Sequence, residues 1–478
     1  MSQPGPGRLL DILGLGFGLA GAVGGTIGAG ILRTPGLVAA QLPSPALVLA
    51  VWLAGGLYAL LGAVCIAELA AALPQAGGWY VYAERAFGRQ VGFLVGWTDW
   101  LAHCIGLAWV ATTVGDYGLA LLPADLLPAG MSLEGSISKG LALLAIGLFS
   151  LIQLRGLRAS SASQELLSLA KAVAFLALVA ACFVLPIPTA PPIELPAPVP
   201  MAAVGWRSLS LAVVLALRAV ITTYDGWASP VYFAEEFSAP GRDLPRSLIG
   251  GVLAVLVLYL LINLALLHVL PIAQLASSSL PAAAAAQALA GPLGALLITA
   301  IALVSLLGLI NTVVMAAPRI LFGLSRDGLL PSAMAAVNGG GTPAIALLIT
   351  STAAAALVLA GSFERLLAMG AVLYVSLPLA GIAALLALRR QEPNLPRPFR
   401  TWGYPLTPPA GRRGVAGVFG RHRPGRLGRQ PRSPGAGGPG LRSVSANPHP
   451  PSRAVSPAPP SSARPAGGCL SRPGFRGR

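Results

Sequence analysis

Charged side chains are scarce in this sequence. Asp, Glu, Lys and Arg make up 10% of the 478 residues, whereas 55% of the residues are hydrophobic. Soluble domains carry about 25% charged residues. Lysine occurs only twice, as Lys139 and Lys171. This shortage excludes an ordinary soluble domain and is typical of a protein that crosses a membrane many times.

Catalytic and metal-binding motifs are missing as well. The four cysteines are scattered, and the sequence has no CxxC pair, GxSxG, HExxH or phosphate-binding loop. We therefore expect no enzyme activity, no metal and no cofactor. Without a phosphate-binding loop, we also do not expect ATP-driven pumping by this chain alone.

Acidic residues and lysine are absent from residues 409–478, which hold 13 of the 32 basic residues. The rest of the chain therefore has 19 basic and 16 acidic residues, and most of the net charge of +16 lies in this segment. Its composition can neither span a membrane nor bury a core, so we predict a disordered tail. We interpret it as a shifted reading frame in a GC-rich gene. The alternatives are a tail that binds anionic lipid or nucleic acid, and the second is disfavoured because interleaved aromatic residues are lacking.

Long apolar runs dominate the remainder, residues 1–408. Ten of them reach the length of about 20 residues that a membrane-spanning helix needs. They lie near residues 10–40, 45–70, 90–120, 139–156, 162–185, 207–233, 246–270, 292–322, 343–361 and 366–388. The sequence therefore predicts an all-α polytopic membrane protein.

Basic residues between these runs indicate the orientation, because cytoplasmic loops are enriched in Arg and Lys. With a cytoplasmic N-terminus, the outer loops carry little beyond Lys139, Arg207 and Arg365. The inner loops then carry Arg8, Arg85, Arg89, Arg155, Arg158, Arg242, Arg246, Arg326, Arg389, Arg390, Arg397 and Arg400. We expect a multi-pass protein of the inner (cytoplasmic) membrane with its N-terminus in the cytoplasm.

Two of the ten runs are interrupted. The first contains GGTIGAG at residues 24–30, and the sixth contains TTYDGW at residues 222–227. The two runs lie five spans apart, so they would cross the membrane in opposite directions. Paired interruptions in inverted halves point to the central site of a secondary transporter. The alternative is that the glycines only let helices pack closely.

Unwound backbone offers bare peptide dipoles. Amides of residues 28–30 could hold a carboxylate, and carbonyls near residues 25–26 and 222–223 could hold an ammonium group. A zwitterion with both charges on one carbon fits this arrangement. The backbone alone therefore suggests an α-amino acid as the ligand.

Ionisable residues inside spans are costly and so are functional candidates. Lys171 lies midway along the fifth run. It is interpreted as a proton-coupling group, with a fixed cation in place of a structural sodium ion as the alternative. Asp225 could contact substrate, titrate or pair with Arg218, seven residues earlier; a gate or structural pair is favoured.

The other polar and aromatic residues within the runs are assigned supporting roles. We interpret Glu68 and Arg319, near the ends of their runs, as loop-anchoring or gating groups. Tyr224 and Trp227, beside the second interruption, are predicted to wall a substrate cavity. Four residues without a partner at ligand or catalytic spacing are interpreted as hydrogen-bonded residues of the bundle: Asp99, His103, Asp116 and His268.

Several motifs resemble a known family. GGTIGAGILRTPG (24–36) and TTYDGWASPVYFAEEFSAPGRDLPRSL (222–248) are similar to the amino acid–polyamine–organocation transporters, in particular the L-type amino acid transporter branch and its bacterial relatives. So are AELAAALPQAGGWYVYAERAFG (67–88), PRILFGLSRDGLLP (318–331) and LALRRQEPNLPRPFRTWGYPL (386–406). The resemblance covers roughly residues 8–406. Two further helices that usually follow in the family are missing here.

The resemblance implies a five-plus-five inverted-repeat (LeuT-like) core with discontinuous first and sixth helices. It implies proton coupling at Lys171. It also implies substrate binding at Thr26, Ile27, Gly28, Ala29, Gly30, Thr222, Thr223, Tyr224, Asp225 and Gly226. An aromatic residue often found in the family at the position of Thr222 is absent.

These observations predict a secondary active amino acid transporter that works by proton symport or amino acid exchange. Thr222 and Ala29 suggest a roomy, uncharged cavity, so a neutral amino acid is the expected substrate. The alternative, motivated by the missing helices, is a transport-incompetent membrane protein or an amino acid sensor.

Overall fold

The computed structural model describes residues 9–28, 30–42, 44–121, 131–186, 205–278, 280–361, 363–402 and 404. The chain divides into two units, Met1–Phe419 and Gly420–Arg478, and every described residue belongs to the first. The predicted disordered tail, residues 409–478, lies outside the described residues. So does Ala29 in the first interruption.

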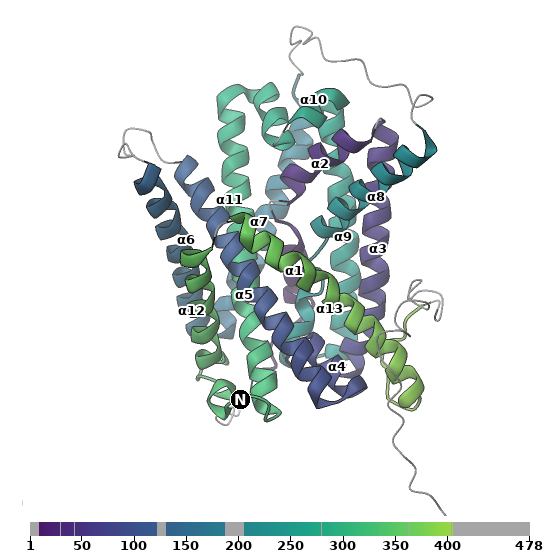
Figure 1. The fold of residues 1–478 in the computed structure, drawn as a ribbon, viewed down its shortest axis with the longest axis vertical. Helices are drawn as coiled ribbons and strands as arrows, with labels where there is room; N and C mark the ends of the chain where they lie inside the picture. Colours follow the sequence, from purple (N-terminus) through teal and green to yellow (C-terminus); the bar gives the residue numbers. More distant parts are fainter. Residues whose placement is uncertain are drawn as a thin grey trace, which may run out of the picture. The chain divides into compact units, whose positions relative to one another are not determined.

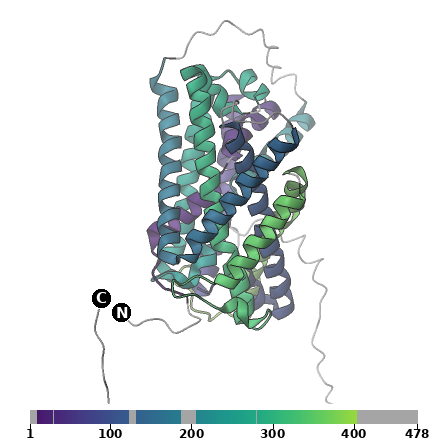
Figure 2. The ribbon, with the colours of Figure 1, turned by 90° about the vertical axis from the view of Figure 1, so that its left-hand side faces the viewer.

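The described residues are almost entirely helical (Figures 1 and 2). The first half contains α1 (Leu15–Thr26), α2 (Gly30–Gln41), α3 (Pro45–Ala72), α4 (Trp79–Phe87), α5 (Arg89–Ala120), α6 (Met131–Leu154) and α7 (Leu157–Val184). The second half contains α8 (Trp206–Thr223), the 3-10 helix η3 (Ser229–Glu236), α9 (Pro240–Val269), α10 (Ile272–Ser277), α11 (Pro281–Arg326), η4 (Ser332–Ala335), α12 (Ala344–Ala360) and α13 (Phe363–Gln391). The predicted all-helical architecture is confirmed.

Helix boundaries follow the local sequence. Ser44 caps α3 by accepting a hydrogen bond from the backbone N–H of Leu47 at 3.3 Å, and Pro45 occupies the first helical position. Gly88 separates α4 from α5 with φ 89°, and Gly156 separates α6 from α7 with φ 115°. Glycine is required at both junctions because L side chains are strained at such angles.

Eight of the ten predicted spans are long and apolar enough to cross a membrane. Seven are single helices: α3, α5, α6, α7, α8, α9 and α11. The eighth is the pair α1 and α2, whose axes meet at 47° across a short break. The last two predicted segments correspond to α12, which is apolar but 17 residues long, and to α13. The chain is therefore a multi-span membrane protein.

Small residues allow the long helices to pack closely. A Cβ atom added to Gly56 of α3 would lie 2.3 Å from Leu256 of α9, and one added to Gly251 of α9 would lie 2.4 Å from the Cβ of Ala22 in α1. Because lipid is as apolar as these side chains, close van der Waals packing of this kind holds membrane helices together. The interrupted helix α1 is thereby fixed against α9.

Three arginines make polar contacts at or near α4, which lies at the lower end of the bundle in Figure 1. The guanidinium of Arg85 pairs with Glu392 at 2.8 Å, and that of Arg326 pairs with Glu235 at 2.7 Å. Arg89 donates to the backbone carbonyl of Asp327 at 2.8 Å. The prediction that Arg85, Arg89 and Arg326 lie on one side of the membrane is thus consistent with their contacts.

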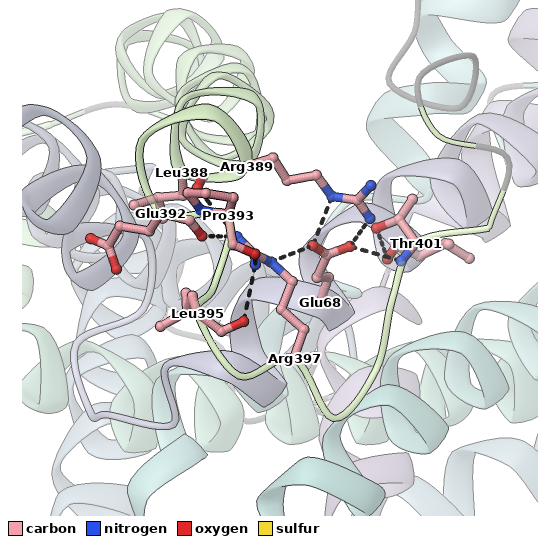
Figure 3. Close-up of polar contacts among 9 residues, drawn as sticks. Glu68, Leu388, Arg389, Glu392, Pro393, Leu395, Arg397 and Thr401 are labelled. Atoms are coloured by element: carbon pink, nitrogen blue, oxygen red, sulfur yellow. Dashed lines mark hydrogen bonds and ion pairs between the residues drawn. The ribbon is translucent and has the colours of Figure 1, made fainter.

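Glu68 anchors a loop at this same end, as predicted (Figure 3). Its buried carboxylate, at the end of α3, is paired with the guanidinium groups of Arg389 and Arg397. It also accepts a hydrogen bond from the backbone N–H of Thr401 at 2.8 Å. Two arginines and an amide compensate the cost of burying one carboxylate, so the segment after α13 is held against α3.

Candidate functional site

The first interruption separates α1 from α2. Helix α1 ends at Thr26, and Ile27 has extended backbone angles of φ −77° and ψ 99°. Helix α2 begins at Gly30 after the bend. A break of this kind leaves carbonyls at the end of one helix and amides at the start of the next without helical partners. The predicted discontinuity of the first span is confirmed.

The second interruption separates α8 from η3. Helix α8 ends at Thr223, the backbone turns over residues 224–228, and Gly226 has φ 101°. The turn holds itself together, because the hydroxyl of Ser229 donates to the carbonyl of Gly226 at 2.6 Å and its amide donates to the same oxygen at 3.1 Å. The predicted interruption at TTYDGW is therefore present.

The two interruptions touch through their backbones. A Cβ atom on Gly226 would lie 2.2 Å from the carbonyl oxygen of Gly25, and one on Gly25 would lie 2.7 Å from the carbonyl oxygen of Gly226. Next to this contact, the hydroxyls of Thr34 in α2 and Thr223 in α8 are 2.7 Å apart. Residues about 200 positions apart in the sequence thus form one backbone-lined site.

Tyr259 of α9 joins the two interruptions, a role that no sequence pattern indicated. Its buried hydroxyl lies 3.1 Å from the carbonyl oxygen of Thr26 and 3.3 Å from that of Thr223. The two carbonyls therefore point toward a common position. Each carbonyl oxygen has two lone pairs, so both retain acceptor capacity beside this hydroxyl.

Lys171 of α7 is fully buried and faces the first interruption. Its ammonium group donates to the carbonyls of Gly24 at 2.9 Å, Ile27 at 3.0 Å and Ser305 at 3.2 Å. Three acceptors match the three donors of a charged lysine. The cation also lies at the end of α1, where the helix dipole is negative. Lys171 thereby ties α1 to α7 and α11.

The glycines of the first interruption fall into two groups. A Cβ atom on Gly24 would lie 2.1 Å from the side-chain nitrogen of Gln164, and Gly25 is just as tightly enclosed. Close packing, the alternative interpretation, thus accounts for these two. At Gly28 and Gly30 the nearest atoms are side-chain carbons, of Leu309 at 3.3 Å and of Thr223 at 3.1 Å. These two glycines belong to the break itself.

Several side-chain expectations need correction. The ion pairs of the described residues do not include one between Arg218 and Asp225; Asp225 lies beyond the end of α8 and is exposed. Tyr224 is 2% exposed and its ring packs against Trp52 and Tyr259. Trp227 is similarly buried, against Trp79. Both rings therefore pack between helices in this structure, and their role as walls of a substrate cavity stays a prediction.

A buried polar cluster confirms the expectation of hydrogen-bonded bundle residues and adds a pairing that the sequence interpretation overlooked. Asp99 and His103, interpreted as residues without a partner at functional spacing, contact each other, with Nδ1 of His103 3.1 Å from Oδ1 of Asp99. The hydroxyl of Tyr232 in η3 donates to the same Oδ1 at 3.0 Å. The missed signal was the spacing of four residues, which places both side chains on one helix face. Of the other two residues, Asp116 accepts from Ser138 at 2.7 Å and His268 stacks on Phe183.

A buried ion pair lies at the end of η3, after the second interruption. Arg319 of α11 donates to both carboxylate oxygens of Glu236, at 2.8 and 2.9 Å, and to the carbonyl of Met315. The backbone amide of Leu13, just before α1, donates to the carbonyl of Glu236 at 2.8 Å. This bidentate pair joins α11 to η3, and the amide of Leu13 joins the start of α1 to the same residue. The loop-anchoring or gating role of Arg319 stays a prediction.

Comparison with known proteins agrees with this architecture. Residues 12–412 match the amino acid permease family. The chain belongs to this family. It is therefore an amino acid transporter and not an enzyme, and the predicted membership of the amino acid–polyamine–organocation superfamily is confirmed.

Three relatives illustrate the range of the family. The serine/threonine exchanger SteT of Bacillus subtilis (strain 168) is 28% identical over 324 residues, 67% of this chain and 69% of SteT. The branched-chain amino acid permease BcaP of Lactococcus lactis subsp. cremoris (strain MG1363) is 28% identical over 422 residues, 84% of this chain and 87% of BcaP. The methylthioribose transporter of Bacillus subtilis (strain 168) is 28% identical over 397 residues, 81% of this chain and 83% of that protein.

Proposed function

We propose that this transporter is a secondary active carrier of neutral α-amino acids, which it moves by proton symport or by exchange. The observation that carries the proposal is the contact between the two interrupted helices. Gly25 and Gly226 meet backbone to backbone, and the carbonyls of Thr26 and Thr223 converge beside Tyr259. The site would be a set of main-chain dipoles, which recognise the part common to all α-amino acids.

In this proposal, the start of α2 binds the substrate carboxylate. The first amides of a helix lack intrahelical partners and lie at its positive end, so they favour an anion. Gly28 and Gly30 carry no side chain of their own, which would let a ligand approach their backbone closely. Ala29, the third residue of the predicted carboxylate site, lies outside the described residues.

The substrate ammonium group would bind the carbonyls at the ends of α1 and α8. The convergence of the Thr26 and Thr223 carbonyls supports this assignment. Thr222, in the last turn of α8, and Asp225, two residues after that helix ends, are both exposed. The proposed site is therefore reachable from solvent. The backbone of Ile27, Tyr224 and Gly226 completes the proposed binding set.

Lys171 keeps both of its interpretations. As a proton-coupling group, it would release the carbonyls of Gly24 and Ile27 when it loses its proton. As a fixed cation, it would hold them throughout the transport cycle, as a structural sodium ion would. Its three carbonyl contacts are compatible with both interpretations. We favour proton coupling, because a buried lysine readily changes its protonation state.

The architecture that we propose is the five-plus-five inverted repeat of LeuT-like transporters, with residues 1–408 as the transport core. The interrupted pair α1 and α2 would correspond to α8 and η3 in the second half. The N-terminus would face the cytoplasm across the inner (cytoplasmic) membrane. The arginines at the α4 end of the bundle support this orientation under the positive-inside rule.

Neutral substrates are proposed for two reasons. The names of two relatives specify serine, threonine or branched-chain amino acids. In addition, the charged side chains described at the interruptions are Asp225 and Lys171, and the ammonium group of Lys171 already donates to three carbonyls. Serine, threonine and leucine are therefore the first substrates to test, with arginine and glutamate as charged comparisons.

Proteoliposomes that contain the full chain test the proposal. We expect vesicles preloaded with unlabelled serine, threonine or leucine to take up the same radiolabelled amino acid faster than protein-free vesicles. Arginine and glutamate should be taken up more slowly. Lys171→Ala should abolish the response to a pH gradient if this lysine couples protons, whereas unchanged uptake would remove that role and leave exchange intact. No uptake of any of the five amino acids would contradict the proposed function.

A further inference from the structure

His103 is held with one ring nitrogen pointing at Asp99. Nδ1 lies 2.9 Å from the backbone carbonyl of Asp99 and 3.1 Å from its Oδ1. Both oxygens are acceptors, so Nδ1 must carry a hydrogen. Nε2 is therefore the nitrogen that can gain or lose a proton. The ring is also packed edge-on against Tyr232, at 4.9 Å between centroids, which fixes its plane.

Asp99 lies behind the imidazole and is fully buried. Its Oδ1 accepts from Tyr232 at 3.0 Å, whereas Oδ2 is buried without a hydrogen-bond partner among the described residues. A buried carboxylate whose donors among the described residues are one hydroxyl and one neutral imidazole N–H is costly to keep charged. A positive charge on His103 would neutralise it, because the pair changes from a net charge of −1 to 0 when Nε2 binds a proton.

The His103 member of the pair is partly exposed. The side chain of His103 is 14% exposed, and its charge interacts with that of Asp225, the exposed carboxylate of the second interruption. Tyr232 lies six residues after Gly226, in the 3-10 helix that continues from the same interruption. The cluster thus connects α5 with the proposed substrate site through two elements that belong to that site.

Other charges do not dominate this environment. Among the described residues, the charged groups that act on His103 are Asp99 and Asp225, and Tyr232 is the titratable group that η3 brings to Asp99. The cluster therefore has two carboxylates and one imidazole, a composition suited to binding a proton.

We propose that Asp99, His103 and Tyr232 form a proton-binding site of this transporter, next to Asp225 and separate from Lys171. A proton from water reaches Nε2 of His103, gives an imidazolium paired with Asp99, and returns to water on the other side of the membrane after the helices have moved. Lys171, in contrast, is fully buried and has three carbonyls against its ammonium group. The inference rests on the proposed transport function, to which it adds a second proton-binding site beside the one proposed at Lys171.

The test compares two kinds of transport in proteoliposomes that contain the full chain. Counterflow exchange needs no gradient, whereas accumulation is driven by a vesicle exterior more acidic than the interior. With one proton per substrate, a gradient of about one pH unit supports about tenfold accumulation. We expect His103→Gln to abolish this accumulation and to retain counterflow within about threefold of wild type, since glutamine keeps polar contacts but cannot carry the charge.

Two further variants complete the design. His268→Gln is the matched control, because His268 stacks on Phe183 and has no resolved carboxylate partner; accumulation should stay at the wild-type level. Tyr232→Phe keeps the ring but removes a donor from Asp99. Asp99 then attracts the proton on His103 more strongly, so the pH dependence of uptake should shift toward higher pH. This variant decides the question if His103→Gln does not fold.

Each outcome bears on a specific claim. Wild-type accumulation in His103→Gln, or an unshifted pH profile in Tyr232→Phe, would overturn the proton site. A wild-type protein that exchanges amino acids but ignores the pH gradient would also overturn it, while leaving the proposed transport function intact. A wild-type protein without either activity would refute the transport function itself.

Discussion

The two interruptions are held in place in different ways. The first is supported from outside: Lys171 binds the carbonyls of Gly24 and Ile27, and Ser168 donates to the carbonyl of Ala20 at 2.8 Å. The second supports itself, through turn hydrogen bonds such as those of Ser229 to the carbonyl of Gly226. Among the described residues, the hydroxyl of Tyr259 contacts carbonyls of both interruptions.

This difference assigns distinct roles to the two sites. The backbone of the first interruption depends on helices α7 and α9, so a movement of either helix can change its shape. The second interruption is a local turn that can move as a unit with α8 or η3. In a carrier that alternates between two conformations, the first would respond to its surroundings and the second would transmit the change.

The largest effect should follow Gly226→Ala, where the two interruptions touch. The methyl group would lie 2.2 Å from the carbonyl oxygen of Gly25, and the residue has φ 101°. Main chain cannot give way as a flexible side chain can, so we expect transport to fall to background. Uptake per unit of monodisperse protein measures this.

Gly88→Ala is the matched control for backbone strain. Gly88 has φ 89°, but nothing lies within 4 Å of an added Cβ atom. Strain alone costs about 1–3 kcal/mol at such angles. We expect a lower thermal midpoint with measurable transport. Equal loss in both variants would show that the contact with Gly25 has no special importance.

The next largest effect should follow Lys171→Met, which tests the external support of the first interruption. Methionine fills a similar volume but cannot donate to the carbonyls of Gly24, Ile27 and Ser305. Hydrogen bonds from a charged donor contribute about 1.5–3 kcal/mol each to stability. We expect a marked fall in the thermal midpoint of the purified protein.

Ser229→Ala is the counterpart in the second interruption. The carbonyl of Gly226 loses the hydroxyl at 2.6 Å but keeps the amide of residue 229 at 3.1 Å. The thermal midpoint should therefore fall less than in Lys171→Met. If Ser229→Ala were the more damaging change, the distinction between external and local support would be wrong.

The sequence predicted the features that are local in the chain. Glycine clusters and the YDG triplet marked the two interruptions, Lys171 stood out as a charge in an apolar run, and Glu68 and Arg319 marked the ends of helices. Asp99 and His103 were also detectable, because four residues along a helix place side chains on one face. Their pairing was overlooked because each residue was considered by itself.

Tyr259 could not be found in this way. A tyrosine in an apolar run is typical of packing, and its carbonyl partners lie 233 and 36 residues away in the sequence. Only the packing of α9 against α1 and α8 brings its hydroxyl to Thr26 and Thr223. In the same way, the sequence suggested that Tyr224 walls a cavity, whereas its neighbours Gly55 and Gly56 in α3 leave a slot that its ring fills.

The smallest effect should follow Tyr259→Phe, which tests whether one hydroxyl links the two interruptions. Phenylalanine keeps the ring contacts with Trp52 and Tyr224 and removes only the donor to Thr26 and Thr223. A buried hydrogen bond contributes about 1 kcal/mol. Tyr224→Phe is the matched control, because its hydroxyl donates to the carbonyl of Trp52 at 3.3 Å and to neither interruption. Both variants should lose similar thermal stability, but Tyr259→Phe alone should change the apparent affinity for substrate in uptake assays. A change in affinity of the same size in both variants would mean that the hydroxyl of Tyr259 contributes only to packing, and that the two interruptions are coupled through the contact of Gly25 with Gly226 alone.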